Sequence, residues 1–186
     1  MDIQAEIKQY LNSKAIGQIS SQVGTSDSET KSVINSALPM ILGGLAKETD
    51  QDALGSTIDE KHSGSILDNV IEAISNSNTH TEGNKILGHI FGSNNQKAAQ
   101  AINKKTGVDT AKIMMIMAII APFILGKLGK SKSDNNLDAG GLMDILKNQK
   151  IGKENNSILG SILDKNNNGS VVDDLINIGG SIFGKK

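Results

Sequence analysis

Residues 113–128 read IMMIMAIIAPFILGKL and form the most apolar stretch of this 186-residue chain. Ile, Met and Ala lie on every side of the segment, so a helix formed here would be buried all round. The apolar run is interrupted by Pro122 and closed by Lys127, which leaves it short for a membrane-spanning helix. We therefore expect a core helix and no transmembrane segment, with a kink or a break at the proline.

The same pattern occurs earlier in the chain, where residues 39–45 read PMILGGL and residues 122–128 read PFILGKL. A shift of 83 residues without gaps aligns residues 3–47 with 86–130 and gives thirteen identities in 45 positions. The identical pairs include Ile3/Ile86, Asn12/Asn95, Ala15/Ala98, Ile19/Ile102, Gly24/Gly107, Pro39/Pro122, Leu42/Leu125 and Leu45/Leu128. Self-similarity of this kind indicates an internal duplication.

A second alignment, at an offset of 105, matches residues 54–71 with residues 159–176. The larger offset indicates an insertion in the second copy. The predicted organisation is a first helical unit at 1–76, a polar linker at 77–83, the first part of a second unit at 84–130, a polar insertion at 131–157 with a short helix near 138–148, and the C-terminal loop-helix part of the second unit at 158–186.

The periodicity within each unit is helical. Ile3, Ile7 and Leu11 recur at i, i+4 and i+8, and a continuous apolar stripe follows from Val33 to Leu45. Ser26 and Glu29 have the spacing of a capping box, and so do Ser65 with Asp68 and Ser170 with Asp173. No segment alternates with the period of two that a strand requires. The chain is predicted to be all-α and multihelical, as two divergent copies of a helical unit packed around an aliphatic core.

The composition excludes several kinds of chemistry. There is no Cys, which removes disulfides, thiol catalysis and Cys-ligated zinc, and all 19 basic residues are Lys. A net charge of −1 and the absence of Arg give no basic face for nucleic acid, so no nucleic-acid partner is expected. The N-terminus MDIQAEIKQYLNSK is amphipathic and carries acids, unlike a signal peptide, and we expect a cytoplasmic protein.

One candidate metal site follows the pattern of an EF-hand loop. Position one is Asp164, Gly169 occupies position six, and Leu175 stands where calcium-binding loops place a bidentate Glu. The candidate oxygen ligands are Asp164, Asn166, Asn168, Ser170, Asp173 and Asp174, and calcium is the one cofactor that the sequence suggests. The first copy of this loop has Lys61 at the third ligand position, where an ammonium cannot bind calcium. What both copies share is a Gly-Ser turn, so turn formation is the alternative interpretation.

No catalytic residue is predicted. The three histidines, His62, His80 and His89, have no second ligand at helical spacing, and no Ser lies in a nucleophile-elbow pattern. The Gly- and Lys-containing segments GGLAK and GKLGK follow apolar helices, where the helix C-terminus disfavours anions. The helix–Gly–helix arrangement around Gly24 and Gly107 is shared with helix-turn-helix proteins, but the second helices are too apolar to enter a DNA groove.

Two segments carry a family resemblance. The combination of LPMILGGL at 38–45 with APFILGKLGK at 121–130 resembles the YidB-like bacterial proteins, also called domain of unknown function 937. The C-terminal ILGSILDKNNNGSVVDDLINIGGSIFG at 158–184 is similar to the usual ending of that family. The resemblance implies a multihelical bacterial fold and brings no activity or catalytic residue.

These observations lead to two functional hypotheses. The first is a non-enzymatic protein that acts by protein–protein contact and self-associates, with the apolar helix at 113–126 as a surface that another subunit could cover. The second is a calcium- or ligand-responsive module that uses residues 164–174.

Overall fold

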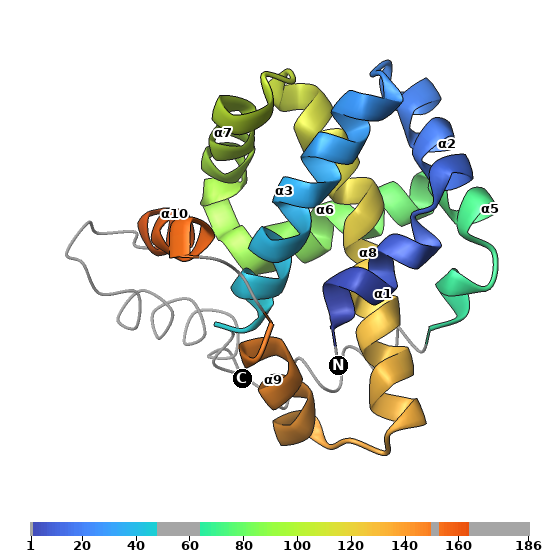
Figure 1. Ribbon diagram of the computed structural model, residues 1–186, viewed down its shortest axis with the longest axis vertical. Helices are drawn as coiled ribbons and strands as arrows, with labels where there is room; N and C mark the ends of the chain where they lie inside the picture. The colour runs from blue at the N-terminus through green and yellow to red at the C-terminus, as the bar shows by residue number, and fades with distance from the viewer. Residues whose placement is uncertain (1, 48–63, 150–152, 164–186) are drawn as a thin grey trace, which may run out of the picture.

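The computed structural model describes residues 2–47, 64–149 and 153–163 (Figure 1). Throughout these ranges the structure is helical and contains no β-strand, so the all-α prediction is confirmed. The elements are α1 (Ile3–Tyr10), α2 (Ser13–Val23), α3 (Asp27–Leu45), the 3-10 helix η1 (Ser65–Leu67), α5 (Val70–Ser75), α6 (Ser77–Phe91), the 3-10 helix η2 (Gly92–Asn94), α7 (Asn95–Thr106), α8 (Thr110–Asp134), α9 (Ala139–Lys147) and α10 (Lys153–Leu163).

Helix α8 is the centre of the fold (Figure 1), and it contacts α1, α2, α3, α6, α7, α9 and η1. Every residue from 116 to 129 is buried, whereas Met115 is 46% exposed. The helix is long and apolar enough to cross a membrane, yet 78% of its most apolar 18-residue window is buried inside this chain. The apolar sequence at 113–126 is therefore covered by the protein's own helices.

The core is aliphatic, as the composition predicts. Its largest fully buried side chains include Phe91 and Phe123, and most of the others are Ile and Leu. Helix α3 contributes a continuous buried stretch from Ala37 to Leu45, packed against α8. Aliphatic burial of this extent is the main driving force for such a fold.

The sequence predicts a kink or a break at each proline, and neither helix breaks: α3 continues through Pro39 and α8 continues through Pro122. A proline in a helix removes one hydrogen bond, to the carbonyl four residues earlier. Near Pro39 that carbonyl belongs to Asn35, an exposed residue, where water can hydrate it. Because both prolines are buried among packed helices, tertiary contacts hold each helix together across the missing bond.

Helix α6 begins in the segment that the sequence predicts to be a polar linker. Residues 77–83 are the first half of α6, so the linker prediction is wrong. The side chain of Asn76 caps the helix by accepting a hydrogen bond from the Asn78 N–H, at 2.9 Å. Helix α6 then crosses α8 so closely that a Cβ added to Gly83 would lie 1.7 Å from the Ala118 carbonyl oxygen. The Asn76 cap and this close packing both accompany the helical conformation of the polar segment.

The turns before α3 and α8 are alike in backbone conformation, since Gly24 and Gly107 are both left-handed, with φ of 72°. The predicted capping box at the start of α3 is confirmed: Glu29 accepts from the Ser26 N–H at 2.7 Å, and Ser26 Oγ accepts from the Glu29 N–H at 3.2 Å. Lys112 of α8 donates to the Gly24 carbonyl at 2.5 Å and so ties the two turns together.

Helix α1 is held by two contacts with residues far along the chain. The Ile3 N–H donates to Oε1 of the buried Gln149, at 3.0 Å, across 146 positions of sequence. Nζ of Lys127 lies 2.6 Å from Oε2 of Glu6, and the Lys127 side chain is only 8% exposed. These contacts attach the start of the chain to α8 and to the residues that follow α9.

Candidate functional site

The candidate calcium ligands, Asp164, Asn166, Asn168, Ser170, Asp173 and Asp174, lie outside the described residues, and so does most of the corresponding loop of the first copy. Within residues 2–47, 64–149 and 153–163 there is no group of three or more His, Asp or Glu that could hold a metal ion. The calcium hypothesis stays a prediction.

The described end of the first loop is a turn that packs against α8. Gly64 has φ of 100°, and a Cβ added there would lie 2.9 Å from Lys130 Cβ and 3.3 Å from the Gly126 carbonyl oxygen. The capping box predicted for Ser65 and Asp68 is wrong, since η1 begins there without a side-chain cap. The backbone instead makes a tight 3-10 turn, which places Ile66 and Leu67 against α8.

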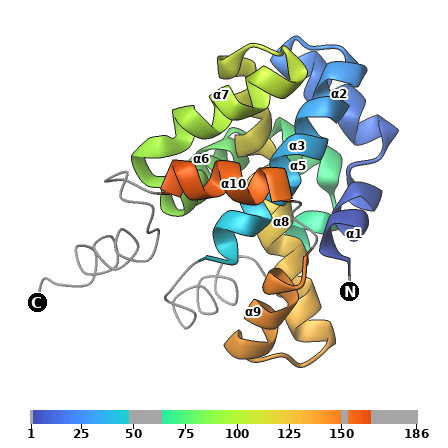
Figure 2. The same cartoon turned by 60° about the vertical axis from the view of Figure 1, so that its left-hand side comes forward.

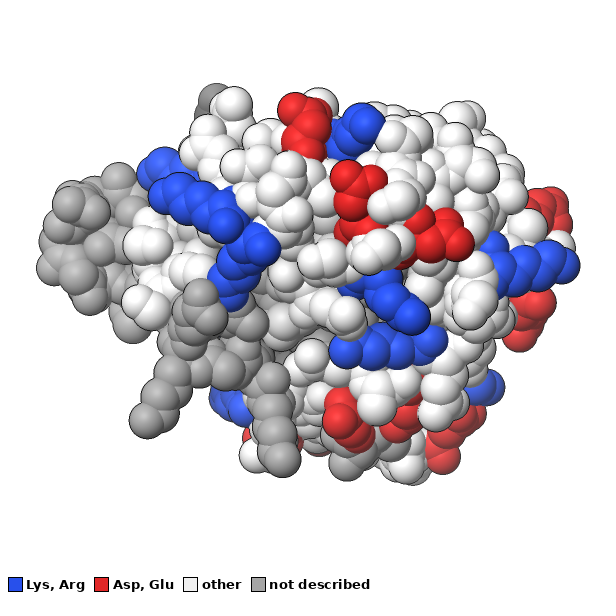
Figure 3. All heavy atoms as spheres, turned by 45° about the horizontal axis from the view of Figure 1, so that its top comes forward, with Lys and Arg blue, Asp and Glu red and all other residues white. Residues whose placement is uncertain are grey.

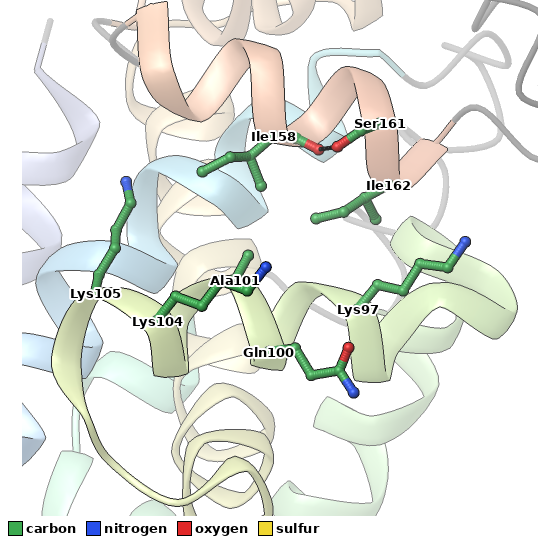
Figure 4. Close-up of a pocket in the computed structure, with 8 residues that line it drawn as sticks. All are labelled: Lys97, Gln100, Ala101, Lys104, Lys105, Ile158, Ser161 and Ile162. Carbon is green, nitrogen blue, oxygen red and sulfur yellow. Dashed lines mark hydrogen bonds between the residues drawn. The ribbon is translucent and has the colours of Figure 1, made fainter.

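A groove of about 460 Å³ lies between α7 and α10 (Figure 4). Lys97, Gln100, Ala101, Lys104 and Lys105 line it from α7, and Ile158, Ser161 and Ile162 line it from α10. Figure 2 shows α10 lying across α3 and beside α7, and α10 contacts both of these helices. The groove is therefore formed by segments about sixty residues apart in the sequence.

The two faces of α7 explain its side of the groove. Ala98, Ala99 and Ile102 face the core and are fully buried, whereas Lys97, Gln100 and Lys104 are exposed on the other side. Lysines 104 and 105 lie in the last turn of the helix, where the helix dipole favours positive charge. The small side chain of Ala101, between the lysines, leaves room for the hollow.

Helix α10 supplies the apolar side of the groove. Its Leu159, Ile162 and Leu163 are buried against the core, and Ile158 is partly buried beside them. Ser161 Oγ donates to the Ile158 carbonyl at 2.8 Å, drawn as the dashed line in Figure 4, so its oxygen can still accept a hydrogen bond. The groove thus combines an apolar floor with polar and cationic edges.

The eight lining residues include three lysines and no carboxylate. Figure 3 shows a row of lysine side chains at the upper left of the molecule with no acidic side chain among them. Elsewhere on the described surface the charges are mixed: a smaller groove of about 320 Å³ is lined by both Lys14 and Asp68. A third hollow, of about 250 Å³, has Glu72 on its edge. The α7/α10 groove differs from these two because the charged side chains that line it are all lysines.

The buried polar groups act structurally. Ser20 Oγ donates to the Ile16 carbonyl at 2.8 Å and lies 2.8 Å from Thr30 Oγ1, which also contacts Thr25 Oγ1 at 2.8 Å. This hydroxyl chain joins α2 to α3 with its oxygens paired, rather than exposing a nucleophile. The ring of His80 contacts the Ile74 carbonyl at 2.7 Å, which joins α6 to α5.

Glu29 and Lys47, both among the described residues, have shifted pKa values. Hydrogen bonds from the backbone and the side chain of Ser26 lower the pKa of Glu29, because they stabilise its carboxylate form. Burial lowers the pKa of Lys47, since desolvation disfavours its charged form. Glu29 is a helix cap and Lys47 follows the last turn of α3, so neither shift indicates an acid–base pair.

Sequence reasoning did not find the α7/α10 groove. The apolar residues of α10 and the lysines of α7 are each visible as amphipathic patterns, but nothing local says that these two helices meet. It also missed the burial of Lys127, whose partner Glu6 lies on the first helix. A lysine inside a continuous apolar stripe is the one signal that could have suggested a buried ion pair.

Comparison with known proteins gives a family and no activity. Residues 5–131 match a bacterial protein family of unknown function, DUF937, and the match ends before α9, so residues 158–184 are not part of it. No curated protein matches the chain. No solved structure matches it either. Since the family match covers more than half of the sequence, the chain belongs to the bacterial DUF937 family of proteins of unknown function.

Proposed function

We propose that this chain is a non-enzymatic protein that acts by binding other proteins, and that the α7/α10 groove is a contact surface. The observation that supports this is the groove's lining. Ile158, Ile162 and Ala101 form an apolar floor, and the charged side chains beside it are three lysines. Apolar centres with polar edges are typical of protein contact surfaces.

The lining favours a protein segment over a small molecule. Small-molecule sites enclose most of the ligand and fix it with a few placed polar groups. Here the lysines and Gln100 are exposed, and long exposed side chains adapt to a partner rather than hold a ligand in one pose.

Self-association remains part of the proposal, but the apolar helix no longer motivates it. Residues 116–129 of α8 are covered by the chain's own helices, so a second copy would have to use another surface. The described chain offers few apolar alternatives, since Met115 is its one exposed large hydrophobic residue.

Two measurements test protein contact. Sedimentation velocity over a wide range of concentrations reports self-association. A photo-crosslinking amino acid at Gln100, expressed in a DUF937-bearing bacterium, reports contact at the groove, with the exposed position Lys8 of α1 as the control. We expect a discrete crosslinked product from position 100 that disappears when Lys97 and Lys104 are changed to Glu. A protein that sediments as a monomer at every concentration and forms no discrete product contradicts the proposal.

The alternative function, a calcium-responsive module that uses residues 164–174, rests on the sequence pattern alone. The supporting feature is the D-x-N-x-N-G spacing, and the opposing feature is Leu175 at the closing position.

We also propose that the fold arose by internal duplication. In support, α2 and α7 end one residue before left-handed glycines, at Gly24 and Gly107, and α3 and α8 begin at positions 83 apart. Each of these long helices carries its proline at the same aligned position. An experimental structure in which residues 13–45 do not superpose on residues 96–128 would contradict the duplication.

A further inference from the structure

The arrangement of the lysines along α7 restricts what the groove can bind. Lys97, Ala101, Lys104 and Lys105 are spaced i, i+4, i+7 and i+8, which places them on one face of the helix. Lys97 and Lys104 are about two turns apart, or roughly 10 Å along the axis. Ala101 lies between them as the low point of the face.

The apolar floor lies opposite that low point. Ile158 and Ile162 are one turn apart on α10 and point toward Ala101 (Figure 4). A partner that fits must therefore present an apolar side chain to the middle of the groove. Burying such a side chain against the two isoleucines would add hydrophobic stabilisation to the complex.

The charge on the edges determines the rest of the partner. No acid is among the described residues that line the groove, so an occupant with carboxylates near Lys97 and Lys104 would gain two ion pairs, and a cationic occupant would be repelled. Nucleic acid or another polyanion would also be attracted to lysines, but it would leave the apolar floor uncovered.

From these three observations we infer that the α7/α10 groove binds an acidic helical segment of another protein, with two carboxylates about two turns apart and one Leu, Ile or Phe between them. The inference rests on the proposed function and names the chemistry of its partner. The segment lies along α7, with its acids over Lys97 and Lys104 and its apolar side chain over Ala101. Binding weakens with salt, because the ion pairs are exposed.

The test uses the full chain and three labelled synthetic helical peptides, measured by fluorescence anisotropy. The first carries Glu and Asp seven positions apart with Leu between them, the second has Ser in place of the Leu, and the third has Gln in place of both acids. We expect saturable binding of the first peptide and a loss of about tenfold or more in affinity for each of the others.

Protein variants locate the binding. We expect two protein variants to lower the affinity for the first peptide by about tenfold or more. One is the double variant Lys97→Glu, Lys104→Glu, and the other is Ala101→Leu, whose larger side chain fills the low point. Lys8→Glu on α1 makes the same kind of charge change away from the groove and should leave affinity unchanged. Of the three lining positions that are changed, Lys97 and Lys104 are exposed and Ala101 is only partly buried, so thermal melting monitored by circular dichroism should show every variant folded.

Three results overturn the inference. Equal binding of the Leu and Ser peptides, or no effect of Ala101→Leu, identifies a site for polyanions in general. Absence of saturable binding at millimolar peptide removes the acidic segment as the occupant. If no peptide binds and the groove variants instead abolish concentration-dependent sedimentation, the occupant is a second copy of this chain. That result would support protein contact as the function and contradict the acidic segment of another protein as the occupant.

Discussion

Pro122 influences more than its own helix. It has no N–H, so the carbonyl of Ala118, four residues earlier, has no partner within α8. That same carbonyl oxygen is the atom that a Cβ on Gly83 would meet. Helix α6 therefore packs Gly83, which has no side chain, against a carbonyl that the proline has freed, where a Cα–H group can make a weak hydrogen bond.

This contact gives a sharp prediction for Gly83→Ala. The added Cβ would lie 1.7 Å from a backbone oxygen, which cannot rotate away, so the two helices must move apart. We expect a loss of about 3 kcal/mol in unfolding free energy, measured by urea denaturation. Gly88→Ala in the same helix is the control, since its Cβ would meet nothing within 4 Å, and it should be neutral or stabilise by up to about 1 kcal/mol. Equal effects of the two substitutions would refute the close crossing.

The Glu29 cap predicts a pH dependence. Because the folded-state pKa of Glu29 is lowered, its contribution to stability is present above the ordinary value near 4.5 and is lost as pH falls through the lowered pKa. At pH 7 the Glu29→Gln protein should melt at a lower temperature than the wild type. As the pH falls through the lowered pKa of Glu29, the two melting temperatures should converge, as scanning calorimetry would show. A difference that stays constant across this range would mean that the carboxylate charge is irrelevant.

At the scale of the elements, α3 and α8 carry the core. Leu42 is fully buried and Leu125 is 3% exposed. Truncation of either to Ala should destabilise the protein by about 2–5 kcal/mol, because buried Leu side chains leave a cavity. Chemical denaturation of both variants measures this directly. If either substitution lowers the free energy of unfolding by less than about half a kcal/mol, the side chain at that position is not in the core.

The ion pair between α1 and α8 predicts an asymmetry between its two partners. Glu6→Gln leaves the ammonium of Lys127 buried without a countercharge, which we expect to destabilise by about 3 kcal/mol. Lys127→Met removes the buried charge and leaves Glu6, whose side chain is 33% exposed, accessible to water. That change should stay within about 1 kcal/mol. Urea denaturation measures the unfolding free energy of both variants. If water hydrates Lys127, Lys127→Met should destabilise the protein more than Glu6→Gln does.

The elements that periodicity predicts well are those whose own sequence favours them. The apolar stripes of α3 and α8 and the Ser26/Glu29 cap are local, and all three were visible in the sequence. The first half of α6 was not, because its polar residues are helical through the contact of Gly83 with Ala118, on a helix that follows later in the chain. The continuity of the helices through the prolines also depends on packing, which a propensity rule leaves out.

At the scale of the whole molecule, sequence reasoning had least to offer on the site. The α7/α10 groove depends on two helices that meet only in the folded chain. The spacing of Lys97, Ala101 and Lys104 therefore indicates a binding groove only once Ile158 and Ile162 are known to lie opposite. The predicted calcium ligands, by contrast, follow a purely local pattern, which is why they could be named from sequence and why the fold does not test them.

Calcium binding at residues 164–174 has its own test. If the loop binds the ion, millimolar calcium should raise the melting temperature, because a ligand that binds only the folded state stabilises it. Asp164→Ala should abolish that rise. Melting that calcium leaves unchanged in the wild type would assign the loop to turn formation alone, which is the outcome we expect, because the first copy has Lys61 at a ligand position.

The anchoring of α1 also has a consequence for how the protein is made. The N–H of Ile3 can form its hydrogen bond only after Gln149 has been synthesised, and Glu6 can form its ion pair only after Lys127 has been synthesised. A ribosome adds about 5–20 residues each second, so roughly 7–30 seconds separate the synthesis of α1 from that of Gln149. During that interval the nascent chain has an amphipathic helix with nothing to dock on. Any factor that meets the emerging chain in that interval therefore encounters α1 without its partners, and a chain truncated before residue 127 lacks both attachments.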